Sequence, residues 1–379
     1  MAPRASRVRR STRSPVAGKE IAGGPGPADG VETAGRGGDG FVEPMKALGV
    51  TTVPAGSWRS EIKFDGYRAL AVLHGGEVAL WSRNHRSLAG NYPEIVGALR
   101  DLGKRDAVLD GEIVALDREG ISRFQLLQQR ELRGERPPIY YYVFDLLRLD
   151  GKWLLAEPIE KRQRALKKFL GAARDSLLRL SPVFTIEPAE LLSEVRRRGL
   201  EGIVAKASRS PYEPGRRSGR WVKCRVTNAQ EFVIGGFTPP RGGRTHFGAL
   251  LIGYYDNGRL MYAGKVGSGF DHALLASLHK DFMPRVAGQC PFSNLPMARQ
   301  SHGQAMTAAE MRKVTWVRPE LVCEVRFAEW TEEGLLRQPV FLGLRADKSP
   351  AEVVREIVPS PSGRPRRGRP KKTSATVGV

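Results

Sequence analysis

Cysteine is scarce in this sequence of 379 residues, which contains three, Cys224, Cys290 and Cys323. They are widely spaced and form no Cys-x-x-Cys half-site, so we expect neither a disulfide framework nor a structural zinc site. The sequence also lacks an apolar run long enough to cross a membrane and a secretory signal at its N-terminus. These absences predict a soluble, cytoplasmic protein with no membrane partner.

Acidic residues are missing from both ends of the chain. Residues 1–19 and 359–379 each contain six lysines or arginines and no acid, so the two tails supply 12 of the 21 net positive charges. A basic body with basic tails indicates a polyanionic partner, first of all nucleic acid. Solubility alone is the alternative explanation, but an excess of acid would serve solubility better.

Hydrophobic periodicity is absent from residues 1–40, which are rich in Gly, Pro, Ser and Arg, and we expect a disordered basic arm there. An organelle transit peptide has a similar composition. Residues 359–379 should form a second disordered tail. Its segment from Pro365 to Lys372 resembles an AT-hook, in which Arg367 and Arg369 would enter a narrow minor groove. A nonspecific basic tail is the alternative.

The remaining sequence predicts two folded domains, residues 41–228 and 229–358. In the first, short β-branched and aromatic runs alternate with helix-like segments at 93–102, 160–170 and 189–198. This pattern is typical of an α+β domain with mostly antiparallel sheets. The second domain shows short strands with one helix-like segment at 272–282, which fits an OB-fold β-barrel, although a β-sandwich would have a similar pattern.

The segment from Glu61 to Arg68, Glu-Ile-Lys-Phe-Asp-Gly-Tyr-Arg, leads into an apolar strand and is the first candidate for chemistry. Lys63 could be an ordinary surface lysine, but such a surface would need neither Gly66 nor Arg68. As a nucleophile, Lys63 would have to lose its proton, with help from desolvation or nearby cations. It could then attack a phosphorus atom, with Asp65 holding water or metal close by.

Further cations, carboxylates and an aromatic residue follow in order. Their segments are Ser82-Arg83-Asn84, Asp110-Gly111-Glu112, Tyr142-Val143-Phe144-Asp145, Glu201-Gly202-Ile203-Val204-Ala205-Lys206 and Trp221-Val222-Lys223-Cys224-Arg225. Together they offer an amine nucleophile, cations for a triphosphate, carboxylates for a divalent metal and a ring for base stacking. Phosphoryl-group transfer needs this set of parts.

These motifs in this order resemble the covalent nucleotidyltransferases, and specifically the ATP-dependent DNA ligases. The resemblance covers roughly residues 41–350 and includes a closing motif, Gly343-Leu344-Arg345-Ala346-Asp347-Lys348. The amino-acid sequence of these motifs is most similar to that of the ligase modules of bacterial non-homologous end-joining proteins. The resemblance implies a nucleotidyltransferase (adenylation) domain followed by an OB-fold domain.

The resemblance also implies roles for individual residues. Lys63 would take AMP from ATP, and Asp65 and Glu201 would bind Mg²⁺ or Mn²⁺. The residues implied to bind nucleotide are Glu61, Arg68, Arg83, Glu112, Phe144, Lys223, Arg225, Arg345 and Lys348. Among these, Arg68 and Glu112 would hold the ribose, Phe144 would stack on adenine, and Lys223 with Arg225 would hold the α-phosphate. Arg225 stands where the family usually has lysine, and we expect tuning of phosphate binding rather than its loss.

The implied function is sealing of 5′-phosphate/3′-hydroxyl breaks in nicked or broken duplex DNA, in double-strand break repair by end joining. We expect a nucleoid-associated bacterial monomer. Part of its affinity for DNA would come from its tails or from a Ku-type end-binding protein. An RNA ligase or mRNA-capping guanylyltransferase shares the lysine chemistry. A noncatalytic DNA-binding protein is the third alternative, but an idle pocket would have no reason to keep buried charge.

Overall fold

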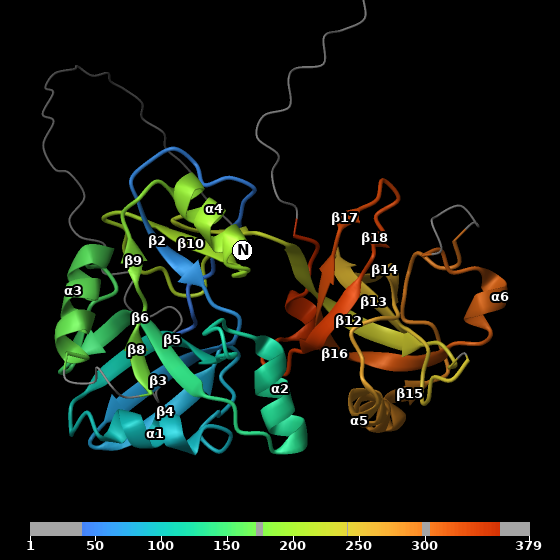
Figure 1. The fold of residues 1–379 in the computed structure, drawn as a ribbon, viewed down its shortest axis with the longest axis horizontal. Coiled ribbons are helices and arrows are strands. Elements are labelled where there is room, and N and C mark those ends of the chain that lie inside the picture. The colour runs from blue at the N-terminus through green and yellow to red at the C-terminus, as the bar shows by residue number, and fades with distance from the viewer. Residues whose placement is uncertain (1–39, 172–176, 241, 298–303, 357–379) are drawn as a thin grey trace, which may run out of the picture. The chain divides into compact units, whose positions relative to one another are not determined.

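The computed structural model describes residues 40–171, 177–240, 242–297 and 304–356. Both basic tails, including Arg367 and Arg369, lie outside the described residues. The ribbon in Figure 1 runs from blue to yellow-green through the first domain and from yellow to red through the second. Among the described residues, no helix combines the length and apolar character that crossing a membrane requires.

The first sheet of the first domain carries the larger part of that domain's core. Its strands, in spatial order, are β4 (Glu77–Ser82), β3 (Tyr67–His74), β5 (Ala107–Ala115), β6 (Ile139–Leu149) and β7 (Lys152–Trp153), and β8 (Leu178–Leu180) also pairs with β6. Alternate side chains of β6, such as Tyr141 and Val143, are buried in the core, as the period of two along a strand requires. Tyr142 and Phe144 therefore lie on the other face.

The second sheet brings the chemical motifs into register. Its strands, in spatial order, are β1 (Leu48–Gly49), β11 (Trp221–Arg225), β10 (Gly202–Ala207), β2 (Trp58–Lys63) and β9 (Val183–Phe184). Gly202 on β10 is opposite Lys63 on one side and Arg225 on the other. Hydrogen bonding between three strands thus places the expected nucleophile, Lys63, and an expected phosphate-binding cation, Arg225, on either side of Gly202.

Four helices belong to this domain: α1 (Pro93–Arg100), α2 (Phe124–Arg133), α3 (Ile159–Phe169) and α4 (Pro188–Arg197). α1 begins with Pro93, whose fixed φ suits the first turn, and buries Ile95, Val96 and Leu99. α3 packs on β6, and α4 packs on β10 and β2. These amphipathic helices cover the sheets and leave the ends of β2 and β11 for the site.

The second domain is an OB-fold barrel. Its main strands are β12 (Asn228–Phe237), β13 (Leu250–Asp256), β14 (Arg259–Val266), β16 (Thr315–Phe327) and β19 (Val340–Leu344). The shorter elements are α5 (His272–Phe282), η2 (Met283–Arg285), β15 (Val286–Ala287), α6 (Ala308–Met311), β17 (Glu329–Trp330), β18 (Leu336–Arg337) and η3 (Pro350–Glu352). A register shift between Ile234 and Gly236 bends β12 where it pairs with β13 and β16.

The structure confirms the α+β class and the mostly antiparallel pairing, with parallel exceptions at β1–β11 and β6–β8. Three predicted helices in the first domain appear as α1, α3 and α4, with ends within two residues of expectation, and the helix at 272–282 appears as α5. Neither α2 nor the short α6 was predicted from the sequence. The absence of α2 from the prediction matters, because this helix contacts the site.

Candidate active site

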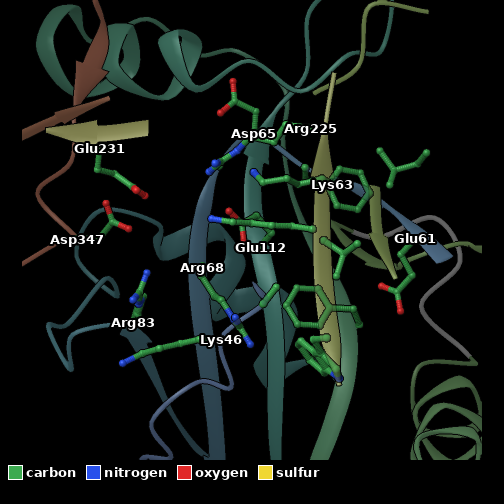
Figure 2. A pocket seen from close by; sticks show the side chains of 18 of the residues that line it. Lys46, Glu61, Lys63, Asp65, Arg68, Arg83, Glu112, Arg225, Glu231 and Asp347 are labelled. Atoms are coloured by element: carbon green, nitrogen blue, oxygen red, sulfur yellow. The ribbon is translucent and has the colours of Figure 1, made fainter. Parts of the chain in front are cut away.

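One pocket gathers most of the predicted site residues (Figure 2). Of the twelve residues assigned to catalysis, nucleotide or metal, eleven line it: Glu61, Lys63, Asp65, Arg68, Arg83, Glu112, Phe144, Lys223, Arg225, Arg345 and Lys348. The twelfth, Glu201, reaches the pocket through an ion pair with Lys63. Segments more than 280 residues apart in sequence therefore meet in one cavity.

Lys63 is the last residue of β2, and its ammonium group pairs with Glu201 Oε1. Burial disfavours the charged amine, but the carboxylates of Glu201 and Glu324 together outweigh this effect and raise the pKa of Lys63 above its usual value. Arg225 opposes Glu201, since its own cation disfavours a second positive charge nearby. Lys63 is therefore held as an ammonium ion in this arrangement.

Lys223 and Arg225 point the same way from β11, as their i, i+2 spacing predicts. Both bind the carboxylate of Glu356, which lies 2.7 Å from Lys223 Nζ and 2.8 Å from Arg225 Nη1. Burial and the neighbouring Arg225 lower the pKa of Lys223 to about 8. Burial opposes the ionised form of Glu356, yet the two cations lower its pKa to about 2. These cations thus already hold an anionic oxygen pair.

Two carboxyl groups in the pocket hold protons more strongly than usual. Burial, together with the charges of Glu201 and Glu324, raises the pKa of Asp65 to about 7. Burial raises the pKa of Glu112 to about 7, although Lys63, among other cations, opposes the shift. Carboxylates that repel one another in a buried site favour a cation between them.

The carboxylate of Asp65 also makes a hydrogen bond to a residue that does not line the pocket. Its Oδ2 accepts a hydrogen bond of 3.1 Å from the backbone N–H of Phe124, the first residue of α2. Gly66, which follows, lies so close to β5 that an added Cβ would be 2.2 Å from the carbonyl oxygen of Ile113. Glycine is therefore required for this loop to pass β5.

The side of the pocket expected to bind base and ribose is aromatic and cationic. Arg68 lies 5.3 Å from the ring of Phe144 and 5.5 Å from that of Trp221. Lys206 Nζ lies 4.4 Å from both rings and pairs with Glu61 at 2.7 Å. Glu61 also accepts hydrogen bonds from Gln163 and Ser181, so its carboxylate is bound on several sides.

The second domain contributes Arg345 and Lys348 through the segment after β19. Arg345 binds Asp347 with two hydrogen bonds of 2.8 and 2.9 Å and Glu324 with one of 2.7 Å, and its guanidinium lies over the ring of Phe124. Lys348 pairs with Glu231 at 2.9 Å. Both predicted cations are thus present in the pocket wall, each held by acids of its own domain.

The sequence analysis assigned no role to several other charged residues at the site. These are Lys46, Lys206, Arg217, Glu231, Glu324, Asp347 and Glu356. Asp347 and Lys206 stand inside quoted motifs, which was a usable signal. Lys46 and Glu356 carry no such signal, because each reaches the site from a segment without a motif.

The carboxylates of the pocket are candidate ligands for a divalent metal ion. Within the described part of the chain, no three His, Cys, Asp or Glu side chains form a ready-made metal site. Oε2 of Glu201, however, is buried without a hydrogen-bond partner among the described residues. A cation held by one or two carboxylates, with the rest of its shell from water and phosphate, fits this arrangement, and Mg²⁺ is usually bound in this way.

Comparison with known protein families identifies both domains. Residues 43–225 match the family described as ATP dependent DNA ligase domain, and residues 243–348 match ATP dependent DNA ligase C terminal region. The multifunctional non-homologous end joining protein LigD of Pseudomonas aeruginosa is 38% identical over 347 residues, which are 89% of this chain and 40% of that protein. The chain spans about 40% of the length of the LigD proteins that it matches.

DNA ligase C1 of Mycolicibacterium smegmatis is 30% identical over 339 residues, which are 84% of this chain and 94% of that protein. Among solved structures, mycobacterial DNA ligase D complexed with ATP and MES is similar, with a TM-score of 0.60 and 38% identity over 83% of this chain and 98% of that one. The two family matches, at residues 43–225 and 243–348, include the motif segments from Glu61 to Arg225 and from Gly343 to Lys348. The chain belongs to the ATP-dependent DNA ligase family.

Proposed function

We propose that this protein seals 5′-phosphate/3′-hydroxyl breaks in duplex DNA through an AMP carried on Lys63. The observation that carries the proposal is the position of Lys63 on β2, with its amine paired to Glu201 and the cations Lys223 and Arg225 one strand further away, on β11 beyond β10. Nζ attacks the α-phosphorus of ATP, the bond to the β-phosphate oxygen breaks, and pyrophosphate leaves. The proton of the ammonium must leave Lys63 before this attack.

The AMP then passes to the 5′-phosphate of the break, whose oxygen attacks the AMP phosphorus and releases Lys63. The 3′-hydroxyl oxygen next attacks the 5′-phosphate, the strand is joined and AMP leaves. In this scheme Lys223 and Arg225 hold the α-phosphate, Arg345 and Lys348 hold the outer phosphates, and Arg83 approaches the nucleotide or the nick phosphate. Fixed cations stabilise the charge that develops on transferring phosphates.

The nucleoside is placed by the aromatic wall. Phe144 offers its face to adenine, Arg68 and Glu112 bind the ribose, and Glu61 lies in the wall of the same pocket. Glu201, with Asp65, would hold Mg²⁺ or Mn²⁺, which would neutralise phosphate charge. Engagement of Glu201 by a cation would also withdraw the carboxylate that keeps Lys63 charged.

We further propose that the cellular reaction is end joining and that a Ku-type end-binding protein assists a monomeric ligase. The LigD relatives are described as non-homologous end joining proteins, and this chain matches about 40% of their length. The basic tails, including Arg367 and Arg369, would add DNA affinity in the bacterial nucleoid. Removal of residues 359–379 should then weaken binding to A·T-rich nicked duplex more than to G·C-rich duplex if the tail is an AT-hook, and equally if it is a nonspecific basic tail.

The function is tested with purified protein, a nicked duplex, a blunt duplex and radiolabelled ATP or GTP with magnesium. We expect ATP, and not GTP, to label the protein and the nick to be sealed, with both activities lost in Lys63→Ala. Lys168→Ala, in an exposed position of α3, is the matched control and should behave as the wild type. Labelling by GTP would favour a capping enzyme, and no labelling would favour a DNA-binding module. Blunt-end joining that is equal with and without the Ku-type protein would contradict the partner.

A further inference from the structure

Four residues from four separate segments form a closed ring of hydrogen bonds beside the nucleotide pocket. Arg68 donates to Asp110 through Nε and Nη2, at 3.0 and 2.6 Å, and to the carbonyl oxygen of Met45 through Nη1, at 2.7 Å. The backbone N–H of Met45 donates to the hydroxyl oxygen of Tyr212 at 2.9 Å. The hydroxyl group of Tyr212 donates to Oδ2 of Asp110 at 2.7 Å and closes the ring.

The ring determines which face of Arg68 is available to a ligand. A guanidinium group has five N–H donors in a planar fork. Three of those on Arg68 have acceptors within 3.0 Å, and Tyr212 Oη lies 3.5 Å from Nη2. Nη1 therefore keeps an N–H to offer, and Arg68 lines the pocket with its side chain 18% exposed. Small rotations of the guanidinium would move this donor away from the pocket.

Arg68 and Asp110 belong to the nucleotide motifs, whereas Tyr212 and Met45 join the ring from other segments. Tyr212 lies in the loop between β10 and β11 and is 1% exposed, with its ring 5.6 Å from Trp221. The same loop is hydrogen-bonded through its backbone to the segment that precedes β1. Lys46 N–H donates to the carbonyl oxygen of Arg216 at 2.8 Å, and Gly215 N–H donates to that of Glu43 at 3.0 Å.

We propose that Tyr212 is a positioning residue for the nucleotide: its hydroxyl group fixes Arg68, through Asp110 and Met45, in the orientation that meets the ribose. A tyrosine that only filled the core would need a single partner for its hydroxyl group. Here the hydroxyl group both donates and accepts, and each partner is itself an acceptor for Arg68. The inference rests on the proposed function of Arg68 in binding ATP.

The test measures transfer of AMP from ATP to the full-length protein, as a function of ATP concentration, in Tyr212→Phe. This variant keeps the ring and loses only the hydroxyl group. We expect the KM for ATP to rise about tenfold, because a hydrogen bond to a charged group is worth about this factor. The rate at saturating ATP should change less than threefold, since a ribose contact is made equally before and during the reaction.

The matched control is Tyr141→Phe. Tyr141 is also fully buried, and its hydroxyl group donates to the carbonyl oxygens of Ala69 and Leu109, the chain neighbours of Arg68 and Asp110, without entering the ring. It should lose comparable thermal stability and leave the KM for ATP within twofold. Asp110→Asn breaks the ring from another side and should raise the KM as Tyr212→Phe does, so the inference is testable even if one variant folds poorly.

A double mutant decides whether Tyr212 acts through Arg68. In an Arg68→Lys background, Tyr212→Phe should raise the KM for ATP by no more than twofold beyond Arg68→Lys alone. A full tenfold increase there, or an unchanged KM in Tyr212→Phe itself, would overturn the inference. Failure of the wild type to take up AMP would instead overturn the proposed function, so the two failures are distinguishable.

Discussion

The carboxylate of Asp65 accepts a hydrogen bond from the backbone N–H of Phe124, 59 residues further along the chain, at 3.1 Å. The residue that precedes α2, Arg123, provides no side-chain cap, so Asp65 satisfies a donor that the helix itself cannot. The loop that begins at Lys63 and the helix that lies under Arg345 are therefore joined by one contact. The loop after Lys63 and the Arg345 side chain of the second domain therefore both contact Phe124, the first residue of α2.

This relationship predicts a difference between two substitutions of Asp65. Asparagine keeps an acceptor for the Phe124 N–H, whereas alanine does not, so Asp65→Ala should be less stable than Asp65→Asn by about 1 kcal/mol. Both should slow AMP transfer, because each removes the charge proposed to attract a metal. Thermal and denaturant unfolding measure the first effect, and radiolabelled ATP measures the second.

Asp271 provides the control pair, since its side chain caps α5 in the second domain by accepting from Leu274 N–H at 2.9 Å. Asp271→Ala should also be less stable than Asp271→Asn, but neither should alter AMP transfer. Equal stability of Asp65→Ala and Asp65→Asn would show that the Phe124 contact does not support α2.

Glu112 predicts a pH dependence of stability. Its pKa is about 7 in the folded protein against an ordinary value of 4.5, so between these pH values the folded state binds a proton that the unfolded state does not. Stability should therefore fall as pH rises from about 4.5 to 7. Glu112→Gln removes this loss. The difference in free energy of unfolding between this variant and the wild type should therefore shift in favour of the variant by about 1–3 kcal/mol as pH rises from about 4.5 to 7.

Glu157 offers the opposite case. Its hydrogen bond from Lys161 lowers the pKa of its carboxyl group, so its ionised form stabilises the folded state. Glu157→Gln should lose stability relative to the wild type as pH rises, the reverse of Glu112→Gln. Denaturant unfolding at several pH values compares them, and the same slope in both variants would refute the burial argument for Glu112.

Lys63 and Lys223, which lie on β2 and β11 with β10 between them, should differ in reactivity toward an amine-modifying reagent. Lys223, with a pKa of about 8, should become reactive in mildly alkaline solution, whereas Lys63 should require a higher pH because Glu201 stabilises its ammonium form. Glu201→Gln should move the reaction of Lys63 to lower pH. Mass spectrometry of peptides measures both, and reaction of Lys63 before Lys223 in the wild type would contradict the assigned ion pair.

Glu356 should compete with ATP, because it binds the two cations proposed to hold the α-phosphate. Glu356→Gln removes the competing charge, and the KM for ATP in AMP transfer should fall by roughly three- to tenfold. Glu320→Gln is the control, since Glu320 pairs with Arg285 at 3.2 Å and with Arg318 at 2.7 Å, and neither arginine lines the pocket. An unchanged or higher KM in Glu356→Gln would show that this carboxylate does not occupy the phosphate position.

Much of the fold was predictable because its signals are local. The helix-like segment 272–282 contains the periodicity of its own element, and the structure gives α5 these same bounds. α2 was missed because its first N–H group is capped by Asp65 from another segment. The parallel pairing of β1 with β11 was missed because a strand of two residues has no period to detect.

The residues of the site also divide into those that could be predicted from the sequence and those that could not. Residues inside motifs, such as Lys63 and Arg345, could be named from the sequence, and the structure brings them into one pocket. Lys46, Tyr212 and Glu356 could not be named, because their contacts are made by segments whose positions depend on tertiary packing. The assigned chemical roles remain predictions for the experiments above.

The most direct test of the central claim is to locate the AMP. The wild-type protein is incubated with ATP and magnesium, digested, and its peptides are sequenced by mass spectrometry. The account predicts a mass increase of one AMP group on Lys63 alone, which is lost in Lys63→Ala and released when nicked DNA is added. AMP on Lys206 or Lys223, or a Lys63→Ala protein that still takes up AMP and seals DNA, would contradict it.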